Sequence, residues 1–325
     1  MLLCLLVHAQ EADNLGKAEF QVIPRFDFNP YTSIGSGGDG SSGFSFGSSS
    51  IYTLLEGALS DNFSYLVSNH WLSTEPGDLY SSTFMSNTNN WLDYCYVDFT
   101  FGNFDLVVGK DMLLTGGIEF DEWDVDVDDI LASELWNTLP AYQWGAKLGF
   151  TTNSGNTSFF VQAATSPYGE YFFKSKLFAY SAQWRGSYGP LSTAWSFSTL
   201  EREPGRFDYL AALGQSLELG DWTIEADWYN SVGMGEYLLL GGHTVRLAAT
   251  WAPSERFDIG LKGNYYISKS VADTESWYNG GLACHFYPLR NSQAIRLHAN
   301  VGYDSAMAQM LASVGIKVNL YLFKL

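Results

Sequence analysis

The chain has 325 residues, 46% of them hydrophobic and 16% aromatic, which is enough for one large domain or two ordinary ones. Its formal net charge is -18, which argues against a nucleic-acid partner, because phosphates require a basic surface. No apolar run reaches the roughly 18–20 residues that a membrane-spanning helix needs, so a helical membrane protein is excluded as well.

The first predicted element is the remnant of a secretory signal at residues 1–9. This stretch, MLLCLLVHA, is apolar and has small residues, Val7 and Ala9, at the two positions that define a cleavage site. We therefore predict cleavage after Ala9 and a mature domain over 10–325. The basic segment that usually precedes such a run is missing.

From Ala18 onwards, apolar and polar residues alternate with a period of two, which is typical of β-strands with two unlike faces. In AEFQVIPRFDF (18–28), for example, phenylalanine and valine alternate with charged and amide side chains. The pattern predicts about sixteen strands, at 18–28, 50–59, 63–72, 91–101, 104–111, 142–151, 158–165, 177–186, 191–200, 207–218, 222–231, 243–251, 257–268, 277–287, 294–303 and 312–323.

The connections between these strands are alternately short and long, as in an up-and-down antiparallel sheet with two unlike ends. In the runs near 18–28, 222–231, 243–251, 294–303 and 312–323 the apolar face carries no charged residue. A charge facing lipid near the midplane costs ~2–4 kcal/mol, so this exclusion is expected. Many runs approach the ~9–11 residues of a tilted membrane strand. We therefore expect an all-β, transmembrane, antiparallel up-and-down β-barrel in the outer membrane. A soluble all-β protein such as a propeller is the alternative, but no blade-length repeat supports it.

The polar face of the strands would line the lumen of such a barrel. A barrel of about this many strands leaves an aqueous channel, so these side chains would meet the solute. The basic residues in this phase are Arg25, Lys147, Arg185, Arg246, Lys262, Arg296 and Lys317. We predict that they line the pore.

The longest connection, 112–141, holds the most acidic stretch, FDEWDVDVDDILASELW (120–136). A long loop can fold into a barrel and narrow it, and acidic rings favour cations whereas basic rings favour anions. We predict a constriction loop near 112–141 that carries the carboxylates of Glu119, Asp121, Glu122, Asp124, Asp126, Asp128, Asp129 and Glu134. The alternative without a functional role is a solvated acidic loop outside the barrel. The Gly/Ser-rich stretch 33–50 is expected to be a flexible loop.

The sequence contains weaker evidence for other functions. Asp124, Asp126 and Asp128 have the spacing of an EF-hand, but Asp129 replaces the required glycine and Leu135 the chelating glutamate, so no metal or other cofactor is predicted. Tyr229 or Tyr266 could give sugars a stacking track. HExxH does not occur, and no GxSxG lies in the strand-to-helix context of a nucleophile elbow, so we predict no enzyme, although an adhesin or a barrel phospholipase with a Ser–His–acid set stays open.

Three stretches resemble the phosphate-selective porin O and P family of Bacteroidota-type bacteria. They are FQVIPRFDF (20–28), LLEGALSDNFSYLVSNHW (54–71) and FDLVVGKDMLLTGGIE (104–119). On this match Gly109 and Lys110 would end the fifth strand, and Glu119 would open the constriction loop.

The resemblance implies a sixteen-strand outer-membrane porin, possibly a homotrimer, that lets small ions or solutes diffuse passively. Its partners would be outer-membrane lipid and those solutes. Family members named for phosphate use clusters of arginine and lysine, and this acidic chain lacks such a ladder. A cation- or sugar-selective channel of the same fold therefore remains an alternative to an anion or phosphate channel.

Overall fold

The computed structural model describes residues 18–34, 41–47, 49–71, 92–169, 176–233, 242–269 and 274–324. The proposed signal at 1–9 and its cleavage site lie outside these residues. Among the described residues, no helix has the length and hydropathy needed to cross a membrane.

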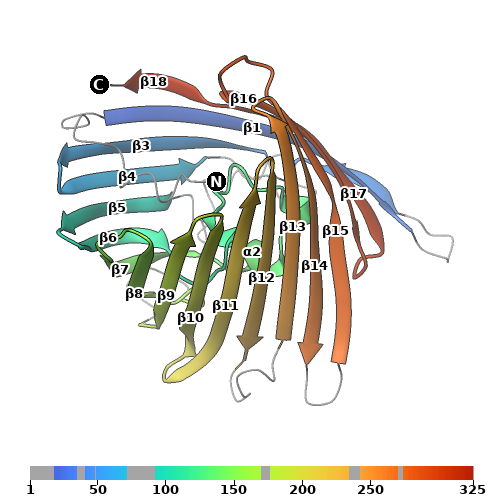
Figure 1. Ribbon diagram of the computed structural model, residues 1–325. Helices are drawn as coiled ribbons and strands as arrows, with labels where there is room; N and C mark the ends of the chain where they lie inside the picture. Colours follow the sequence, from blue (N-terminus) through green and yellow to red (C-terminus); the bar gives the residue numbers. More distant parts are fainter. Residues whose placement is uncertain are drawn as a thin grey trace.

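One antiparallel sheet closes on itself into a barrel (Figure 1). Its strand segments are β1 (Ala18–Ser33), β2 (Ser42–Ser45), β3 (Ser50–Ser60), β4 (Phe63–His70), β5 (Leu92–Phe101), β6 (Phe104–Met112), β7 (Tyr142–Thr151), β8 (Thr157–Thr165), β9 (Phe178–Tyr188), β10 (Leu191–Glu203), β11 (Arg206–Leu219), β12 (Trp222–Val232), β13 (Gly242–Ser254), β14 (Phe257–Lys269), β15 (Thr274–Phe286), β16 (Ile295–Asp304), β17 (Gln309–Val318) and β18 (Leu320–Lys324).

These segments occupy sixteen positions around the barrel. β2 and β3 both pair with one edge of β1, so they count as one interrupted strand. β17 and β18 both pair with the other edge and count as another. The barrel therefore closes at β1, and each predicted strand corresponds to one position. The prediction of a sixteen-strand antiparallel barrel is confirmed.

Two details differ from the expectation. β1 continues to Ser33, five residues past its predicted end, and part of the Gly/Ser-rich stretch is the strand β2 rather than loop. The cause is mutual pairing, because Asn29–Thr32 of β1 bond to Ser42–Ser45. Elsewhere, tight turns join the strands at the short end, where Gly102 and Gly220 have φ of 62° and 61° and so suit glycine.

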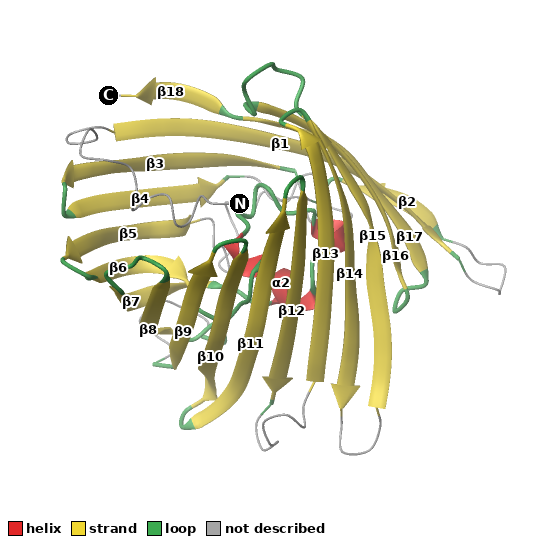
Figure 2. Cartoon of the chain, viewed as in Figure 1, coloured by secondary structure: helices red, strands yellow, loops and turns green. Residues whose placement is uncertain are grey.

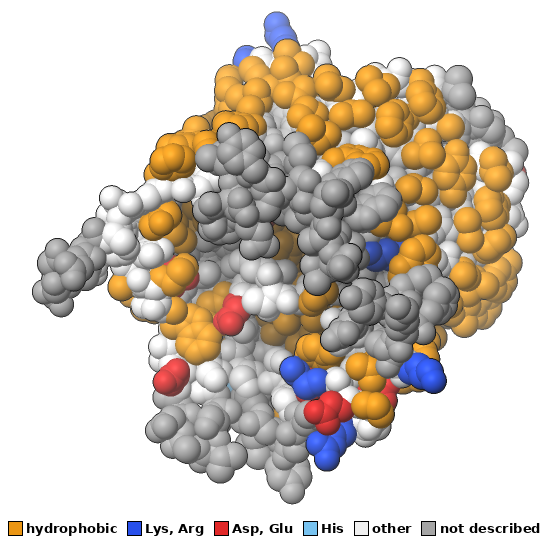
Figure 3. All heavy atoms as spheres, turned by 180° about the vertical axis from the view of Figure 1, so that it is seen from behind, with side chains coloured by type: hydrophobic (Ala, Val, Ile, Leu, Met, Phe, Trp, Pro, Cys, Tyr) orange, Lys and Arg blue, Asp and Glu red, His pale blue; other side chains and the backbone are white. Residues whose placement is uncertain are grey.

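The alternation of faces is that of a barrel in lipid. Leu247, Leu261 and Val314 are 57–58% exposed on the outside, whereas the inward neighbours Arg246 and Lys317 are buried. Figure 3 shows hydrophobic side chains spread over the outer surface of the barrel. Such an apolar outer band with a polar interior is the pattern of transmembrane barrels.

The connection between β6 and β7 lies inside the barrel (Figure 2). It contains the 3-10 turns η3 (Glu119–Asp121) and η4 (Asp129–Leu131) and the short helix α2 (Glu134–Thr138). Its apolar residues pack against inward-facing wall residues. Val125, for example, packs with Ile23 and Tyr52, and Phe120 with Tyr229 and Leu210. The protein's core is thus the contact between this connection and the wall.

Candidate functional site

We call residues 113–141 the inner segment. It begins directly after Met112, the last residue of β6, and crosses to the opposite wall. Leu114 N–H donates to Gln162 on β8, and the hydroxyl of Ser196 on β10 donates to Gly116 O. Ile118 N–H donates to Asp227 on β12 over 2.6 Å. The segment therefore spans the lumen.

Two glycines let the inner segment lie directly against the wall. A Cβ on Gly117 would lie 2.1 Å from Asp227 Oδ1, and one on Gly214 of β11 would lie 2.5 Å from the Ile118 nitrogen. Both are closer than van der Waals contact allows, so only glycine fits. This close approach lets Asp227 accept from the amides of both Ile118 and Glu119.

Arg246 on β13 is the main electrostatic anchor of residues 118–122 of the inner segment. Its guanidinium is 1% exposed and lies 2.9 Å from Asp227, 3.1 Å from Glu225 and 3.4 Å from both Glu119 and Glu122. Two of these carboxylates come from the wall and two from the inner segment. One cation thus joins the segment to two strands, because the four carboxylates would otherwise repel one another.

A second anchor holds Asp128. Lys262 Nζ, His285 Nε2 and Asn300 Nδ2 each lie 3.0 Å from its carboxylate. Burial alone would raise the pKa of Asp128, but the Lys262 ammonium and His285 hold it well below its usual range. Asp128 is therefore ionised at any physiological pH.

A third anchor lies at the barrel seam, which is where β1 pairs with β17 and closes the barrel. Arg25, Lys317 and Arg296 are register partners on the adjacent strands β1, β17 and β16, so three cations stand in a row. Asp126 pairs with both Lys317 and Arg296, the latter over 3.0 Å, and these cations lower its pKa against the opposing effect of burial. Arg25 donates to Val127 O over 2.8 Å.

The structure brings nearly all predicted basic residues to the inner segment. Arg185 makes a two-armed pair with Asp121, and Arg25 also approaches Asp129 at 3.9 Å. Lys147 is the exception, since it pairs at 2.5 Å with Asp111 on β6.

The remaining predicted acidic residues have other surroundings. Asp124 accepts from the Tyr142 hydroxyl over 2.6 Å. Glu134 is exposed at the start of α2, where its backbone N–H donates to Tyr266 Oη. Lys110 lies within β6, which ends at Met112, and donates to Leu92 O.

Two alternatives from the sequence are wrong for the described residues. The EF-hand-like carboxylates do not converge, because Asp124, Asp126 and Asp128 each turn to a different partner, and no cluster of metal-ligating side chains is present in the part described. Tyr229 and Tyr266 cannot form a sugar track, because they are 1% and 3% exposed beneath the inner segment.

Several residues that hold the segment were missed. His285, Asn264, Asn279 and Asn300 all contact residues 128–132. The signal was available, because His285 is the register partner of His298 and lies in the same inward phase as the predicted cations. Uncharged donors were not considered as anchors.

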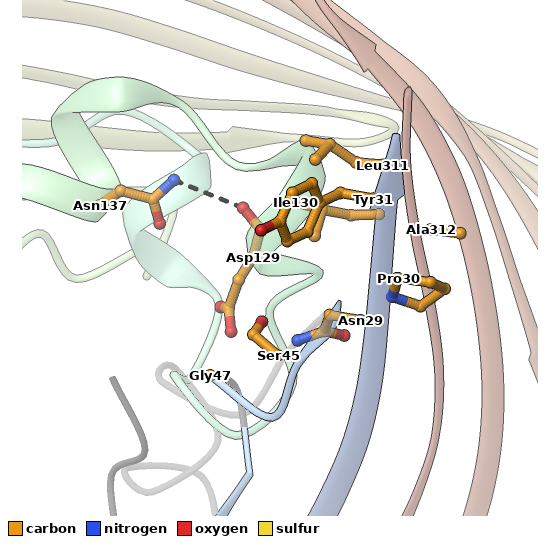
Figure 4. Close-up of a pocket in the computed structure, with 10 residues that line it drawn as sticks. All are labelled: Asn29, Pro30, Tyr31, Ser45, Gly47, Asp129, Ile130, Asn137, Leu311 and Ala312. Atoms are coloured by element: carbon orange, nitrogen blue, oxygen red, sulfur yellow. Dashed lines mark hydrogen bonds between the residues drawn. The ribbon is translucent and has the colours of Figure 1, made fainter. Parts of the chain in front are cut away.

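On the side of the long connections, a cavity of about 250 Å³ lies between the inner segment and the seam (Figure 4). Asn29 and Tyr31 of β1, Ser45 and Leu311 line it from the wall. Asp129, Ile130 and Asn137 line it from the segment. Asn137 donates to Asp129 O over 3.4 Å, which links α2 to η4.

Solved structures of outer-membrane proteins share this fold. The anion-selective porin from Comamonas acidovorans matches with a TM-score of 0.62 and 13% identity, covering 93% of this chain and 100% of the porin. The outer membrane channel DcaP of Acinetobacter baumannii matches with a TM-score of 0.60 and 12% identity, covering 94% of this chain and 98% of DcaP. OmpT of Vibrio cholerae in trimer form matches with a TM-score of 0.59 and 11% identity, covering 93% of this chain and 99% of OmpT.

No protein-family model and no curated protein matches the sequence. At these identities the likeness shows the fold alone. The chain thus has the barrel fold of these outer-membrane proteins, and the phosphate-selective O and P family is not distinguished within that fold.

Proposed function

We propose that this protein is an outer-membrane porin in which the inner segment sets the constriction for passive diffusion of small ions or solutes. One observation carries the proposal: the segment crosses the lumen and pairs with wall cations on β1, β9, β13, β14, β16 and β17. A solute must therefore pass this charged layer. No covalent chemistry is invoked.

We further propose that the channel favours cations over anions. All seven predicted wall cations have carboxylate partners, so the wall offers no free basic track for phosphate. Asp121, Glu122, Asp126 and Asp129 keep 24–39% of their side chains exposed, so negative charge remains in contact with solvent. Acidic linings favour cations.

A homotrimer is proposed as the assembled form. Its support is the trimer form of OmpT, which shares the fold. Cross-linking in native outer membranes, followed by gel electrophoresis, should yield a band at three times the mass of the single chain. A single band at the chain mass after efficient cross-linking would contradict it.

Planar-bilayer recording tests the channel and its selectivity. We expect stepwise conductance in KCl and, under a salt gradient, a reversal potential that shows K⁺ permeating more readily than Cl⁻. The opposite sign would contradict cation preference but not the channel. A folded barrel without conductance would contradict the channel itself.

The inner segment should also make conductance depend on pH. Burial, together with the nearby Asp93 carboxylate, raises the pKa of Asp124 to about 7. A released segment would return this pKa to the ordinary value near 4. The seated form thus takes up a proton as the pH falls from 8 to 5, and seating becomes more favourable, on the order of 2 kcal/mol.

We therefore expect lower conductance at pH 5 than at pH 8 and a weaker dependence in Asp124→Asn. His70 and His285 are wall histidines that also lie beside carboxylates. A full pH response in Asp124→Asn would assign the effect to these histidines instead.

A further inference from the structure

A second cavity, of about 170 Å³, lies where the inner segment meets the long-connection ends of β4 to β7. One part of its lining is polar and titratable: His70, Asp93, Asp124 and Tyr142. The rest is apolar: Met112, Phe120, Trp136, Leu139, Pro140 and Ala141. Neither the seam cavity nor the anchors combine buried carboxylates with an apolar wall in this way.

The polar part of this cavity has an excess of buried carboxylate. Asp93 is 1% exposed, and only its Oδ1 is bonded, to His70 Nδ1 at 2.6 Å. Among the described residues, Asp93 Oδ2 has no hydrogen-bond partner. Asp124 adds a second carboxylate, whose pKa is raised by burial and by the nearby Asp93 carboxylate. A buried carboxylate oxygen without a partner is costly, so a positively charged group would be stabilised there.

No hydrogen-bond donor among the described residues reaches Asp93 Oδ2. Asp129 adds to the negative field at Asp124, and the Tyr142 hydroxyl is neutral. Lys110 on β6 is a nearby cation, but its ammonium donates to the Leu92 carbonyl. In the described part of the chain, Lys110 and His70 are the basic groups beside these two carboxylates, and neither bonds Asp93 Oδ2.

The apolar part indicates the shape of the ligand. Phe120 and Trp136 lie with ring centroids 5.0 Å apart on the segment side. Aromatic faces attract cations, most strongly when desolvated. An apolar cavity of about 150 Å³ in another protein binds benzene, so this volume suits a small organic body. A hydrated metal ion would exchange water oxygens for carbon here, which hard cations disfavour.

We propose that this cavity is a subsite for a small organic cation, with an ammonium group at Asp93 and Asp124 and an apolar body against Phe120 and Trp136. The inference rests on the proposed porin function and names one class of solute for it. An organic anion is disfavoured by the carboxylates, and a neutral analogue lacks the charge that they would bind.

Calorimetry at pH 8, where the Asp124 carboxylate is ionised, tests the subsite on the folded protein in detergent without reference to conductance. Benzylammonium is the probe, with benzyl alcohol as its neutral analogue and benzoate as its anionic one. We expect binding of benzylammonium alone. Its affinity should fall at least about tenfold, or ~1.4 kcal/mol, in Asp93→Asn and in Asp124→Asn. Asp61→Asn, at an exposed turn on the opposite end, is the matched control and should bind like the wild type.

Bilayer recording then separates the two proposals. Reduction of the K⁺ current by benzylammonium in the wild type, and not in Asp93→Asn, would support both. Steady conductance with no calorimetric binding, or with equal binding of benzyl alcohol, would overturn the subsite alone. Calorimetric binding without conductance would overturn the porin and leave the subsite. Two variants are used so that a folding defect in one does not decide the result.

Discussion

Arg246→Met is expected to lower the free energy of unfolding by ~3–5 kcal/mol, the largest loss that we predict for a single side chain. Met keeps the length and apolar character of the stem but removes the charge. Glu119, Glu122, Glu225 and Asp227 would then lie together. Among the described residues, Lys262 alone would remain to compensate them, 3.6 Å from Glu122. Urea unfolding in lipid vesicles, followed by gel mobility, measures the loss.

Arg206→Met is the matched control. Arg206 pairs with Glu203 over 3.3 Å, but its side chain is 68% exposed, and surface pairs of this kind contribute only ~0–1 kcal/mol. If both variants unfolded at the same urea concentration, Arg246 would not be the anchor that its geometry indicates. In the bilayer, Arg246→Met should also show more current noise, because residues 118–122 would lose their main attachment.

Leu247→Arg, the next residue along β13, should cost ~2–4 kcal/mol for a different reason. Leu247 is 57% exposed, near the middle of its strand, on the outer face. In a membrane the new charge would lie near the bilayer midplane. In water the same substitution would place a charge on an exposed surface and change stability little.

Leu219→Arg provides the depth control. Leu219 is 51% exposed at the last residue of β11, where a charge costs only ~0–1 kcal/mol if this end lies at the membrane interface. A large difference between the two arginine variants, measured by unfolding in vesicles, is the expected result. Equal and small costs would contradict a lipid-facing wall.

The sequence predicted the barrel because each strand carries the information locally. A period of two places alternate residues on opposite faces, so the inward phase of Arg25, Arg246 and Lys317 could be read without knowing their neighbours. The strand order then followed from the alternating connections. Only pairing beyond the predicted ends, as between β1 and β2, was not visible, because those residues have no alternating pattern.

The partners of the inner segment could not be predicted in the same way. Whether Asp126 meets Lys317 or Lys262 depends on the path of residues 113–141 across the lumen, which no local period encodes. The path also explains the error at Tyr229 and Tyr266. Both tyrosines have the inward phase that was inferred, but the segment covers them. The phase of a residue predicts which face of its strand it occupies. It does not predict which other part of the chain packs against that face.

The row of cations at the seam has a consequence for how the barrel assembles. When β1 meets β17, Arg25 and Lys317 become register partners, and like charges directly opposite each other are unfavourable. Asp126 relieves this repulsion only if the inner segment is already in place. Its bond to Lys317 spans 191 residues, and such distant contacts form slowly. The last step of folding should therefore be a joint one, in which the seam closes around a seated segment. A barrel that closes early would leave Lys317 and Arg296 without Asp126, and Arg25 with Asp27 alone.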